Sequence, residues 1–326
     1  MVDIVRRLGS ARIVVIGDLI ADEYVYGRVA RVSREAPVLI LEYDSTEVVP
    51  GGAGNAANNA AALGGAVRLV SLVGRDEPGR RAERALAPRV ERRGLVRPAG
   101  FRTPVKTRIL AGGIHSAKQQ VVRIDRLSSR PVTDQERAAV ARAAHAAVAD
   151  ADAVLISDYG SGLVTPALAR AIWDEVRPRK VPVLVDSRYG LTRYRGLTTC
   201  APNESEVEQA LGVRIDDNLR VLERAGRQLL TRTRMQAVIV TRGSRGMAVF
   251  EPGRKTVHIP IFGSDQIADV TGAGDTVMAM LTLALAAGTT VEDAARLANV
   301  AGGLVVMKRG TATVSAAELR RALGSG

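Results

Sequence analysis

The chain has 326 residues, of which 46% are hydrophobic and 25% are charged, so it can bury a large core as one α/β domain. Its single cysteine, Cys200, excludes a disulfide framework. No apolar run is long enough to cross a membrane, and residues 1–12 lack the apolar core of a signal peptide. These features predict a cytoplasmic protein that has no membrane partner.

The formal net charge of +12 comes almost entirely from arginine, because only five of the 46 basic residues are lysines. Arginine binds phosphate groups through two parallel hydrogen bonds, which makes a nucleic-acid partner one explanation. Aromatic residues, however, make up only 3% of the chain, and the arginines are spread along helical stretches instead of forming one block. We therefore expect no nucleic-acid partner.

In chain order, short apolar runs that end near glycine or aspartate alternate with longer helical stretches. The runs predict buried strands at 11–18, 67–73, 153–157, 181–185 and 237–241. The stretches between them predict helices that include 134–149, 166–176 and 219–230. Strands and helices that alternate in this way form a mostly parallel sheet with helices on both faces. We therefore predict an α/β fold whose ligands bind at the carboxyl ends of the strands.

Two segments, at about residues 20–50 and 103–128, interrupt this alternation. They predict short antiparallel strands that form a small β lid over the site. In the second segment, Lys106 and Arg108 occupy alternate positions, so both cations share one face of a strand and are expected to face bound anions. The opposite face of so small a sheet needs cover, which a second lid in a homodimer would provide. An ordinary edge hairpin with protective cations is the alternative.

The segment 269–275 reads DVTGAGD and is followed directly by a long apolar run. Gly272, Ala273 and Gly274 leave the backbone open to close approach by a phosphate. The apolar run predicts a buried helix, whose amino end attracts negative charge. Asp275 falls in the first turn, where it can accept the proton of an attacking hydroxyl group. This arrangement suits phosphoryl transfer to a hydroxyl group, although a plain tight turn would also explain the glycines.

A second glycine-rich segment lies at 50–65 and reads PGGAGNAANNAAALGG. Gly51 and Gly52 predict a turn that a ligand can approach closely, and the alanines that follow predict a helix. Asn55 lies near the start of this helix, where its amide can bind the hydroxyl groups of a sugar. The chain contains no G-x-x-x-x-G-K-[ST] motif, so a P-loop nucleotide site is excluded. A tightly packed Gly/Ala helix without a ligand remains the alternative.

Together the two glycine-rich segments resemble the signatures of the ribokinase-like (PfkB) carbohydrate kinases, and the matching elements follow the family order across nearly the whole chain. The resemblance implies a ribokinase-like α/β fold and an ATP-dependent phosphotransferase that acts on an alcohol group of a sugar. It also makes Asp275 the catalytic base. The backbone of the preceding turn would hold the transferring phosphoryl group, through Gly272, Ala273 and Gly274.

Two further strings resemble the ATP-binding elements of this family. Residues 203–206 match its Asn-x-x-Glu motif, in which the glutamate helps to hold the water shell of Mg²⁺. Asn203 and Glu206 would equally form a helix capping box, and both interpretations remain open. The turn after the next strand resembles an element that contacts ATP phosphates and implicates Thr241, Gly243 and Gly246. The resemblance is also consistent with a monovalent cation such as K⁺ near Asp269 and Thr271.

More particular strings resemble the bacterial D-glycero-β-D-manno-heptose-7-phosphate kinases and lie at 17–27, 31–38, 157–162, 193–196 and 310–315. Such kinases phosphorylate O1 of heptose 7-phosphate and give the 1,7-bisphosphate for synthesis of a nucleotide-activated heptose. The resemblance implies a small sugar phosphate as substrate, with ATP and Mg²⁺. The residues expected to bind this substrate are Asp18, Gly51, Gly52, Asn55, Lys106, Arg108, Asp158 and Arg188.

The chain departs from this pattern in two places. Arg188 follows the strand that ends at Asp186, where such kinases usually have Pro-Lys-Gly, and Ser161 stands where a lysine is common. We expect residues 1–326 to form a single kinase domain, without the nucleotidyltransferase domain that follows many such kinases. One alternative is another ribokinase-like kinase that acts on a hexose phosphate, a pentose or a nucleoside. The other is a sugar-phosphate-binding regulator that has lost catalysis.

Overall fold

The computed structural model of the chain describes residues 2–112, 118–128, 130–263, 269–308 and 310–324. Its central sheet has the strand order β14-β13-β12-β11-β10-β9-β1-β4-β5, and β6 pairs with β4. The described pairs are parallel except β12 with β13 and β13 with β14. The strands are β1 (Arg12–Gly17), β4 (Ala66–Leu72), β5 (Val90–Glu91), β6 (Leu95–Val96), β9 (Ala153–Asp158), β10 (Val183–Ser187), β11 (Thr199–Cys200), β12 (Ala237–Thr241), β13 (Met247–Phe250) and β14 (Val257–Ile259).

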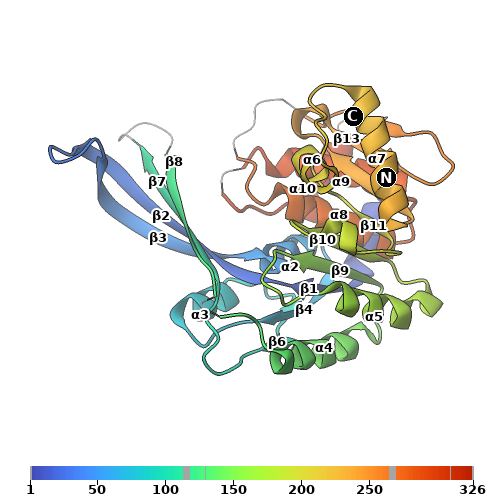
Figure 1. Cartoon of the computed structure of the whole chain (residues 1–326), viewed down its shortest axis with the longest axis horizontal. Helices are drawn as coiled ribbons and strands as arrows, with labels where there is room; N and C mark the ends of the chain where they lie inside the picture. Colours follow the sequence, from blue (N-terminus) through green and yellow to red (C-terminus); the bar gives the residue numbers. More distant parts are fainter. Residues whose placement is uncertain (1, 113–117, 129, 264–268, 309, 325–326) are drawn as a thin grey trace.

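Helices cover both faces of this sheet (Figure 1). One face packs against α1 (Val2–Arg7), α2 (Ala53–Ala62), α8 (Ala273–Ala286), α9 (Val291–Val305) and α10 (Ala316–Gly324). The other face packs against α4 (Asp134–Val148), α5 (Pro166–Val176), α6 (Glu204–Leu211) and α7 (Leu219–Thr233). Side chains of one strand alternate between the two faces, so Ile13 joins the first buried cluster and Val14 the second. The predicted α/β fold is confirmed.

Capping residues fix where the predicted helices begin. Thr133 and Glu136 form a capping box at the start of α4. At α5, the Thr165 side chain accepts a hydrogen bond from the backbone of Leu168, and a proline opens the helix. These signals are local, so the sequence prediction for these two helices agrees with the structure to within a residue.

A second sheet projects away from the central one (Figure 1). We call it the lid; its strands are β2 (Leu19–Val32), β3 (Leu39–Gly52), β7 (Val105–Gly112) and β8 (Gln119–Arg126), in the order β3-β2-β7-β8. The pairs β2–β3 and β7–β8 are antiparallel, as predicted, but β2 and β7 run parallel. Both of these strands leave the core in the outward direction, which explains the parallel pair. β2 and β3 are also longer than the short strands expected.

The two faces of the lid differ in character. Lys106 and Arg108 lie on the face that lines the cavity described below. On the other face, Val105 packs at the base of the lid against Ala82 of α3 (Glu77–Arg84). The predicted separation of the cations from Val105 therefore holds in the structure, and α3 covers the part of the outer face nearest the core.

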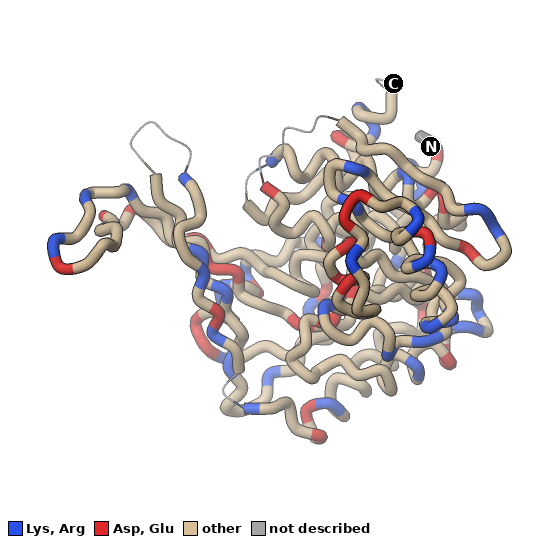
Figure 2. The backbone as a smooth tube through the Cα atoms, turned by 45° about the horizontal axis from the view of Figure 1, so that its top comes forward, with Lys and Arg blue, Asp and Glu red and all other residues tan. Residues whose placement is uncertain are grey.

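Charged residues are spread around the molecule. Figure 2 shows Lys and Arg along many elements, with Asp and Glu between them. Many of these charges form ion pairs on the surface, such as Arg68 with Asp150 and Arg12 with Asp152. In the described part of the chain, no helix has both the length and the apolar character that would let it span a membrane.

Candidate active site

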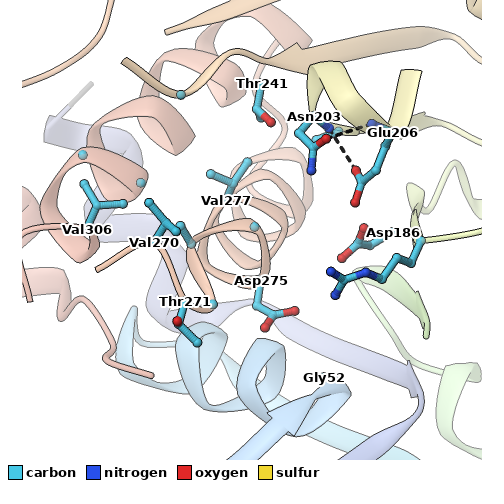
Figure 3. A pocket seen from close by; sticks show the side chains of 18 of the residues that line it. Gly52, Asp186, Asn203, Glu206, Thr241, Val270, Thr271, Asp275, Val277 and Val306 are labelled. Carbon is cyan, nitrogen blue, oxygen red and sulfur yellow. Dashed lines mark hydrogen bonds between the residues drawn. The ribbon is translucent and has the colours of Figure 1, made fainter. Parts of the chain in front are cut away.

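A cavity of about 620 Å³ lies among the carboxyl ends of the central strands, the amino end of α8 and the lid (Figure 3). The predicted site residues that line it are Gly52, Lys106, Arg108, Arg188, Asn203, Glu206, Thr241, Gly243, Gly246, Thr271, Gly272, Ala273, Gly274 and Asp275. Those that do not line it are Asp18, Gly51, Asn55, Asp158 and Asp269. Figure 3 shows Asp275 with Asp186 above it and Gly52 below it.

Asp275 lies at the amino end of α8 and is almost completely buried, with 5% of its surface exposed. Asn55 donates its side-chain amide to Oδ2 of Asp275 at 2.7 Å, and the Tyr159 hydroxyl donates to Oδ1 at 3.0 Å. Burial raises the pKa of Asp275 to about 6, although both donors act to lower it. A carboxylate with this pKa is ionised at neutral pH and can accept a proton.

Asn55 belongs to a buried polar network that extends away from the cavity. Asn59 donates to Oδ1 of Asn55 at 3.0 Å, and the Thr276 hydroxyl donates to Oδ1 of Asn59 at 2.8 Å. Because Oδ1 of Asn55 accepts, its Nδ2 is left to donate to Asp275. Asn55 therefore orients the Asp275 carboxylate from the side that faces away from the cavity. This differs from the sugar contact that the sequence predicted for it.

Gly272 gives the turn before α8 its shape. Its φ of +78° favours glycine, and a Cβ at this position would lie 2.6 Å from the side-chain nitrogen of Asn55. The backbone N–H of Ala273 already donates to the carbonyl of Val270 at 3.2 Å. The N–H of Gly274 has no hydrogen-bond partner among the described residues, so of these two amides it is the one free to bind a phosphoryl group.

Asp18 and Asp158 hold a loop instead of lining the cavity. Asp18 accepts hydrogen bonds from the backbone of Tyr159 at 2.8 Å and from the Ser161 hydroxyl. Asp158 accepts from the hydroxyls of Ser187 and Tyr194 at 2.8 and 2.7 Å. The carboxylate oxygens of both residues are thus engaged within the protein. Neither residue lines the cavity.

Asp22 lines the cavity where the sequence had predicted Asp18. It accepts a hydrogen bond from Arg108 at 2.7 Å, and both side chains are about nine-tenths buried. Gly51 leaves room for this carboxylate, since a Cβ there would lie 2.2 Å from Oδ2 of Asp22. The neighbouring Lys106 places its Nζ 4.8 Å from the centre of the Tyr159 ring. In the sequence, Asp22 was recognisable as a carboxylate inside a predicted lid strand, four residues after Asp18.

Asn203 and Glu206 form the predicted capping box at α6, with both hydrogen bonds at 2.9 Å. Only Oε2 of Glu206 takes part in it, so Oε1 is left to face the cavity with no hydrogen bond from the described residues. Asp186, at the end of β10, is a second carboxylate on this wall, and burial raises its pKa to about 8. Burial also raises the pKa of Glu206, and the charge of Arg188 acts to lower the pKa of both carboxyl groups, so Arg188 lies within electrostatic reach of each.

The turn after β12 lies beside this wall. Gly246 has a φ of +78°, and a Cβ there would lie 2.0 Å from the carbonyl oxygen of Ile259. The turn is held to α6, because Arg242 donates to Glu204 at 2.8 Å. Thr241 pairs with Asn203 through an isolated bridge, which brings the two predicted nucleotide elements side by side.

The far end of the cavity is apolar. Val270, Val277 and Val306 lie along one wall in Figure 3. Gly302 and Gly303 of α9 also line the cavity and leave that face of the helix bare. A flat aromatic base would fit against such a wall. The sequence did not lead to these residues, although two adjacent glycines inside a helix were an available signal.

Asp269 lies beside the cavity and is already hydrogen-bonded. Its Oδ1 accepts from the backbone of Thr271 at 2.9 Å, and its Oδ2 accepts from the backbone of Gly310 at 3.0 Å. Among the described residues, no group of three or more His, Cys, Asp or Glu side chains could hold a metal ion by itself. Among the described residues that line the cavity, Asp186 and Oε1 of Glu206 accept no hydrogen bond from the protein and could ligate a hydrated divalent cation.

Comparisons with known proteins agree with this geometry. Residues 10–318 match the model of the pfkB family carbohydrate kinases. The bifunctional protein HldE of Geobacter metallireducens is 44% identical over 312 residues, which are 95% of this chain and 62% of the relative. HldE of Geobacter sulfurreducens is 41% identical over 318 residues, which are 97% of this chain and 64% of the relative. The chain thus spans somewhat less than two thirds of these relatives.

Solved structures share the fold at low sequence identity. Arabidopsis thaliana ribokinase, complexed with ribose and ATP, has a TM-score of 0.74 at 20% identity, with 96% of this chain and 99% of that chain covered. Phosphofructokinase-2 from Escherichia coli, in complex with potassium, has a TM-score of 0.77 at 17% identity, with 97% and 99% covered. The ribokinase-like fold is therefore shown. With the family match over residues 10–318, the chain belongs to the pfkB family of carbohydrate kinases.

Proposed function

We propose that this protein is an ATP-dependent kinase that phosphorylates O1 of D-glycero-D-manno-heptose 7-phosphate and gives the 1,7-bisphosphate. The observation that carries the kinase activity is the buried Asp275 carboxylate, held at the amino end of α8 inside a cavity with one polar and one apolar end. The strings that resemble heptose-7-phosphate kinases support the choice of sugar. A reaction that consumes ATP is consistent with a cytoplasmic location.

In the proposed reaction, the sugar hydroxyl lies next to Asp275, which accepts its proton as the oxygen attacks the γ-phosphorus of ATP. The N–H of Gly274 and the amino end of α8 stabilise the charge on the transferring phosphoryl group. The adenine base lies at the apolar end, near Val277 and Val306. The lid excludes water from the polar end.

Asp186 and Glu206 would hold the hydrated Mg²⁺ of MgATP, because both carboxylates line the nucleotide side of the cavity and no cation is hydrogen-bonded to either among the described residues. When bound, Mg²⁺ neutralises charge on the β- and γ-phosphates. A K⁺ ion near Asp269 and Thr271 remains part of the proposal. It would add charge compensation close to the turn that holds the phosphoryl group.

Four cations line the cavity on the side that would bind the distal phosphate of the sugar, namely Lys106, Arg108, Arg123 and Arg188, and Arg123 is paired with Asp125. Lys106 and Arg188 line the cavity, and neither forms an ion pair with a described residue. Arg108 is committed to Asp22, so it contributes mainly by holding that carboxylate toward the sugar hydroxyls. We therefore propose that Lys106 and Arg188 make the main contacts with the distal phosphate of the sugar.

A panel of acceptors tests the proposal. Heptose 7-phosphate, hexose phosphates, pentoses and nucleosides are each incubated with ATP and Mg²⁺, ADP release is measured, and ³¹P NMR locates the new phosphate. We expect turnover to be highest with heptose 7-phosphate, with the new phosphate on O1. Asp275→Asn should reduce kcat by about two to four orders of magnitude while ATP binding persists.

Other outcomes would replace the proposal. Preferential turnover of a hexose phosphate, a pentose or a nucleoside would identify a different ribokinase-like kinase. Binding of a sugar phosphate without ADP release would identify a regulator. Turnover of Asp275→Asn at the normal rate would remove Asp275 from the role of base.

We further propose that two chains associate through their lids. Most large apolar side chains that the described residues expose lie in or next to this sheet, namely Val29, Val32, Val38, Leu39, Tyr43, Val121, Val122, Ile124 and Leu127. Val122 and Ile124 lie on the face opposite Lys106 and Arg108, because they pair with Ile109 and Thr107. A second lid would bury this apolar face.

A further inference from the structure

The Tyr159 side chain makes a contact that the proposed reaction has not used. Its hydroxyl donates to Oδ1 of Asp275 at 3.0 Å, while Asn55 occupies Oδ2 at 2.7 Å. Each carboxylate oxygen thus receives one donor from the protein and keeps a second lone pair. With a donor on each oxygen, the plane of the carboxylate cannot rotate without breaking a hydrogen bond.

The loop that carries Tyr159 is itself held in place by hydrogen bonds to Asp18. The backbone N–H of Tyr159 donates to Oδ2 of Asp18 at 2.8 Å, and the Ser161 hydroxyl donates to Oδ1. Between them, Gly160 has a φ of +84° and donates its N–H to Asp158 at 3.0 Å. Asp18 is 4% exposed and directly follows β1. A buried carboxylate in the core thus fixes a loop that lies far away in the sequence.

The ring of Tyr159 is enclosed on two sides. Lys106 lies over one side of it, with Nζ 4.8 Å from the ring centre. Near the ring lies Gly52, where a Cβ would come within 3.4 Å of Cδ2 and where φ is +56°. The hydroxyl therefore points to Asp275 because both the backbone and the ring of Tyr159 are held.

We propose that Tyr159 is a positioning residue for Asp275, and that Asp18 acts through it by anchoring the loop 159–161. The Tyr159 hydroxyl keeps the carboxylate turned so that a free lone pair faces the attacking sugar hydroxyl. This inference rests on the proposed kinase activity, in which Asp275 is the base. It also gives Asp18 a role in catalysis without contact to the sugar.

The charges around Asp275 give this role a measurable consequence. Burial raises the pKa of Asp275, and the hydrogen bonds from Asn55 and Tyr159 act to lower it. The titratable groups that face Asp275 from other elements are Asp22 of β2, Lys106 of β7 and Asp186 of β10. Burial and nearby carboxylates raise the pKa of Tyr159 well above 10, so its hydroxyl stays protonated and donates throughout the range of an assay.

The variant Tyr159→Phe removes the hydroxyl and keeps the ring. We expect kcat to fall by about tenfold at pH 7, because the base is less well oriented. We also expect the acid limb of the kcat/KM profile to move up by about one pH unit, because a donor to the ionised carboxylate is lost. KM for the sugar phosphate should stay unchanged. The matched control is Tyr189→Phe, on an exposed tyrosine of the neighbouring loop, and should keep the wild-type profile.

Two kinetic outcomes would overturn the proposal. A Tyr159→Phe enzyme with the wild-type kcat and acid limb would show that the hydrogen bond does not serve the base. A rise in KM alone, with the acid limb in place, would mean that Tyr159 contacts the sugar instead of positioning Asp275.

A measurement without substrate separates this inference from the proposed function. Aspartate labelled with ¹³C at the carboxyl group is titrated by NMR, and Asp275→Asn identifies the Asp275 signal. Tyr159→Phe should raise the midpoint of that signal, and equal midpoints would overturn the inference. An inactive wild-type protein would count against the kinase proposal alone. If Tyr159→Phe does not fold, Ser161→Ala loosens the same loop and should shift the midpoint in the same direction, and an unshifted midpoint would again contradict the proposal.

Discussion

At the scale of single residues, two buried aspartates share one electrostatic property and serve different ends. Burial raises the pKa of both Asp18 and Asp275 to about 6. Asp18 uses its charge to hold backbone and hydroxyl donors of a loop, whereas Asp275 keeps lone pairs that face the cavity. A raised pKa therefore marks a functional carboxylate only when its free lone pairs can reach a substrate.

The pKa of Asp275 predicts how the rate depends on pH. A base must be ionised to accept a proton, so kcat/KM should fall below about pH 6 and approach a tenfold loss per pH unit. The initial rate with heptose 7-phosphate, measured between pH 4.5 and 8 in buffers of about equal ionic strength, checks this expectation. The residual rate of Asp275→Asn should lack this acid limb. A flat wild-type profile over this range would contradict the assignment.

The sequence revealed Asp275 because its motif is contiguous: the turn, the helix start and the carboxylate all lie within seven residues. Asp18 and Asp22 show the limit of predicting site residues from contiguous motifs. Both lie in one string, and only the fold decides which carboxylate faces the cavity. Asp18 accepts a hydrogen bond from a loop 141 residues away in the chain, and local sequence patterns carry no information on such a contact.

At the scale of elements, the lid carries two neighbouring cations, Arg108 and Lys106, whose surroundings give them different roles. Arg108 forms a nearly buried ion pair with Asp22, with N···O of 2.7 Å. Lys106 lies beside it with its ammonium over the Tyr159 ring, and burial lowers its pKa. The alternation of residues 105–109 predicted that the two side chains share a face. It could not show that one of them is already paired.

Replacing each cation should therefore have a different effect. Lys106→Gln should raise KM for the sugar phosphate, and the effect should shrink as salt screens the lost attraction. Arg108→Gln should lower thermal stability as well, because it leaves the Asp22 carboxylate buried without its partner, a loss on the order of 3 kcal/mol. Steady-state kinetics at two ionic strengths and a thermal melt of each variant make the comparison. Equal melting temperatures would show that the ion pair does not stabilise the lid.

The lid also shows which elements could be predicted. Its presence followed from apolar segments that interrupt the alternation of strands and helices, and its approximate bounds agree with β2, β3, β7 and β8. The parallel pair of β2 and β7 could not be predicted, because a strand pattern contains no direction. Direction depends on where each strand leaves the core.

At the scale of the whole molecule, the lid stands out from the core with an apolar outer face. Val122 and Ile124 are 45% and 49% exposed, which is costly for a single chain in water. The side chains of these residues point away from the cavity, so a partner could cover them without blocking the site. A homodimer that brings two lids together would satisfy both conditions.

Sedimentation velocity tests this assembly. The wild type should sediment as a dimer of about 69 kDa, twice the 34.5 kDa of one chain. The double variant Val122→Glu/Ile124→Glu should shift it to the monomer by placing charges in the apolar contact. Leu219→Glu, at an exposed position outside the lid, is the matched control and should remain dimeric. A wild type that stays monomeric at every concentration would refute the proposed dimer.

The lid is continuous with the core at both of its long strands. β2 begins one residue after β1 ends, with Asp18 between them, and β3 passes directly into α2, whose first turn carries Asn55. Near the base, Tyr24 also hydrogen-bonds to Thr311 at 2.5 Å. Asp18 and Gly52 thus connect the sheet to the core, so a tilt of the sheet would also turn the start of α2. Contact of the sugar with the base of the lid, next to Asp22 and Lys106, and alignment of Asp275 would then be mechanically coupled.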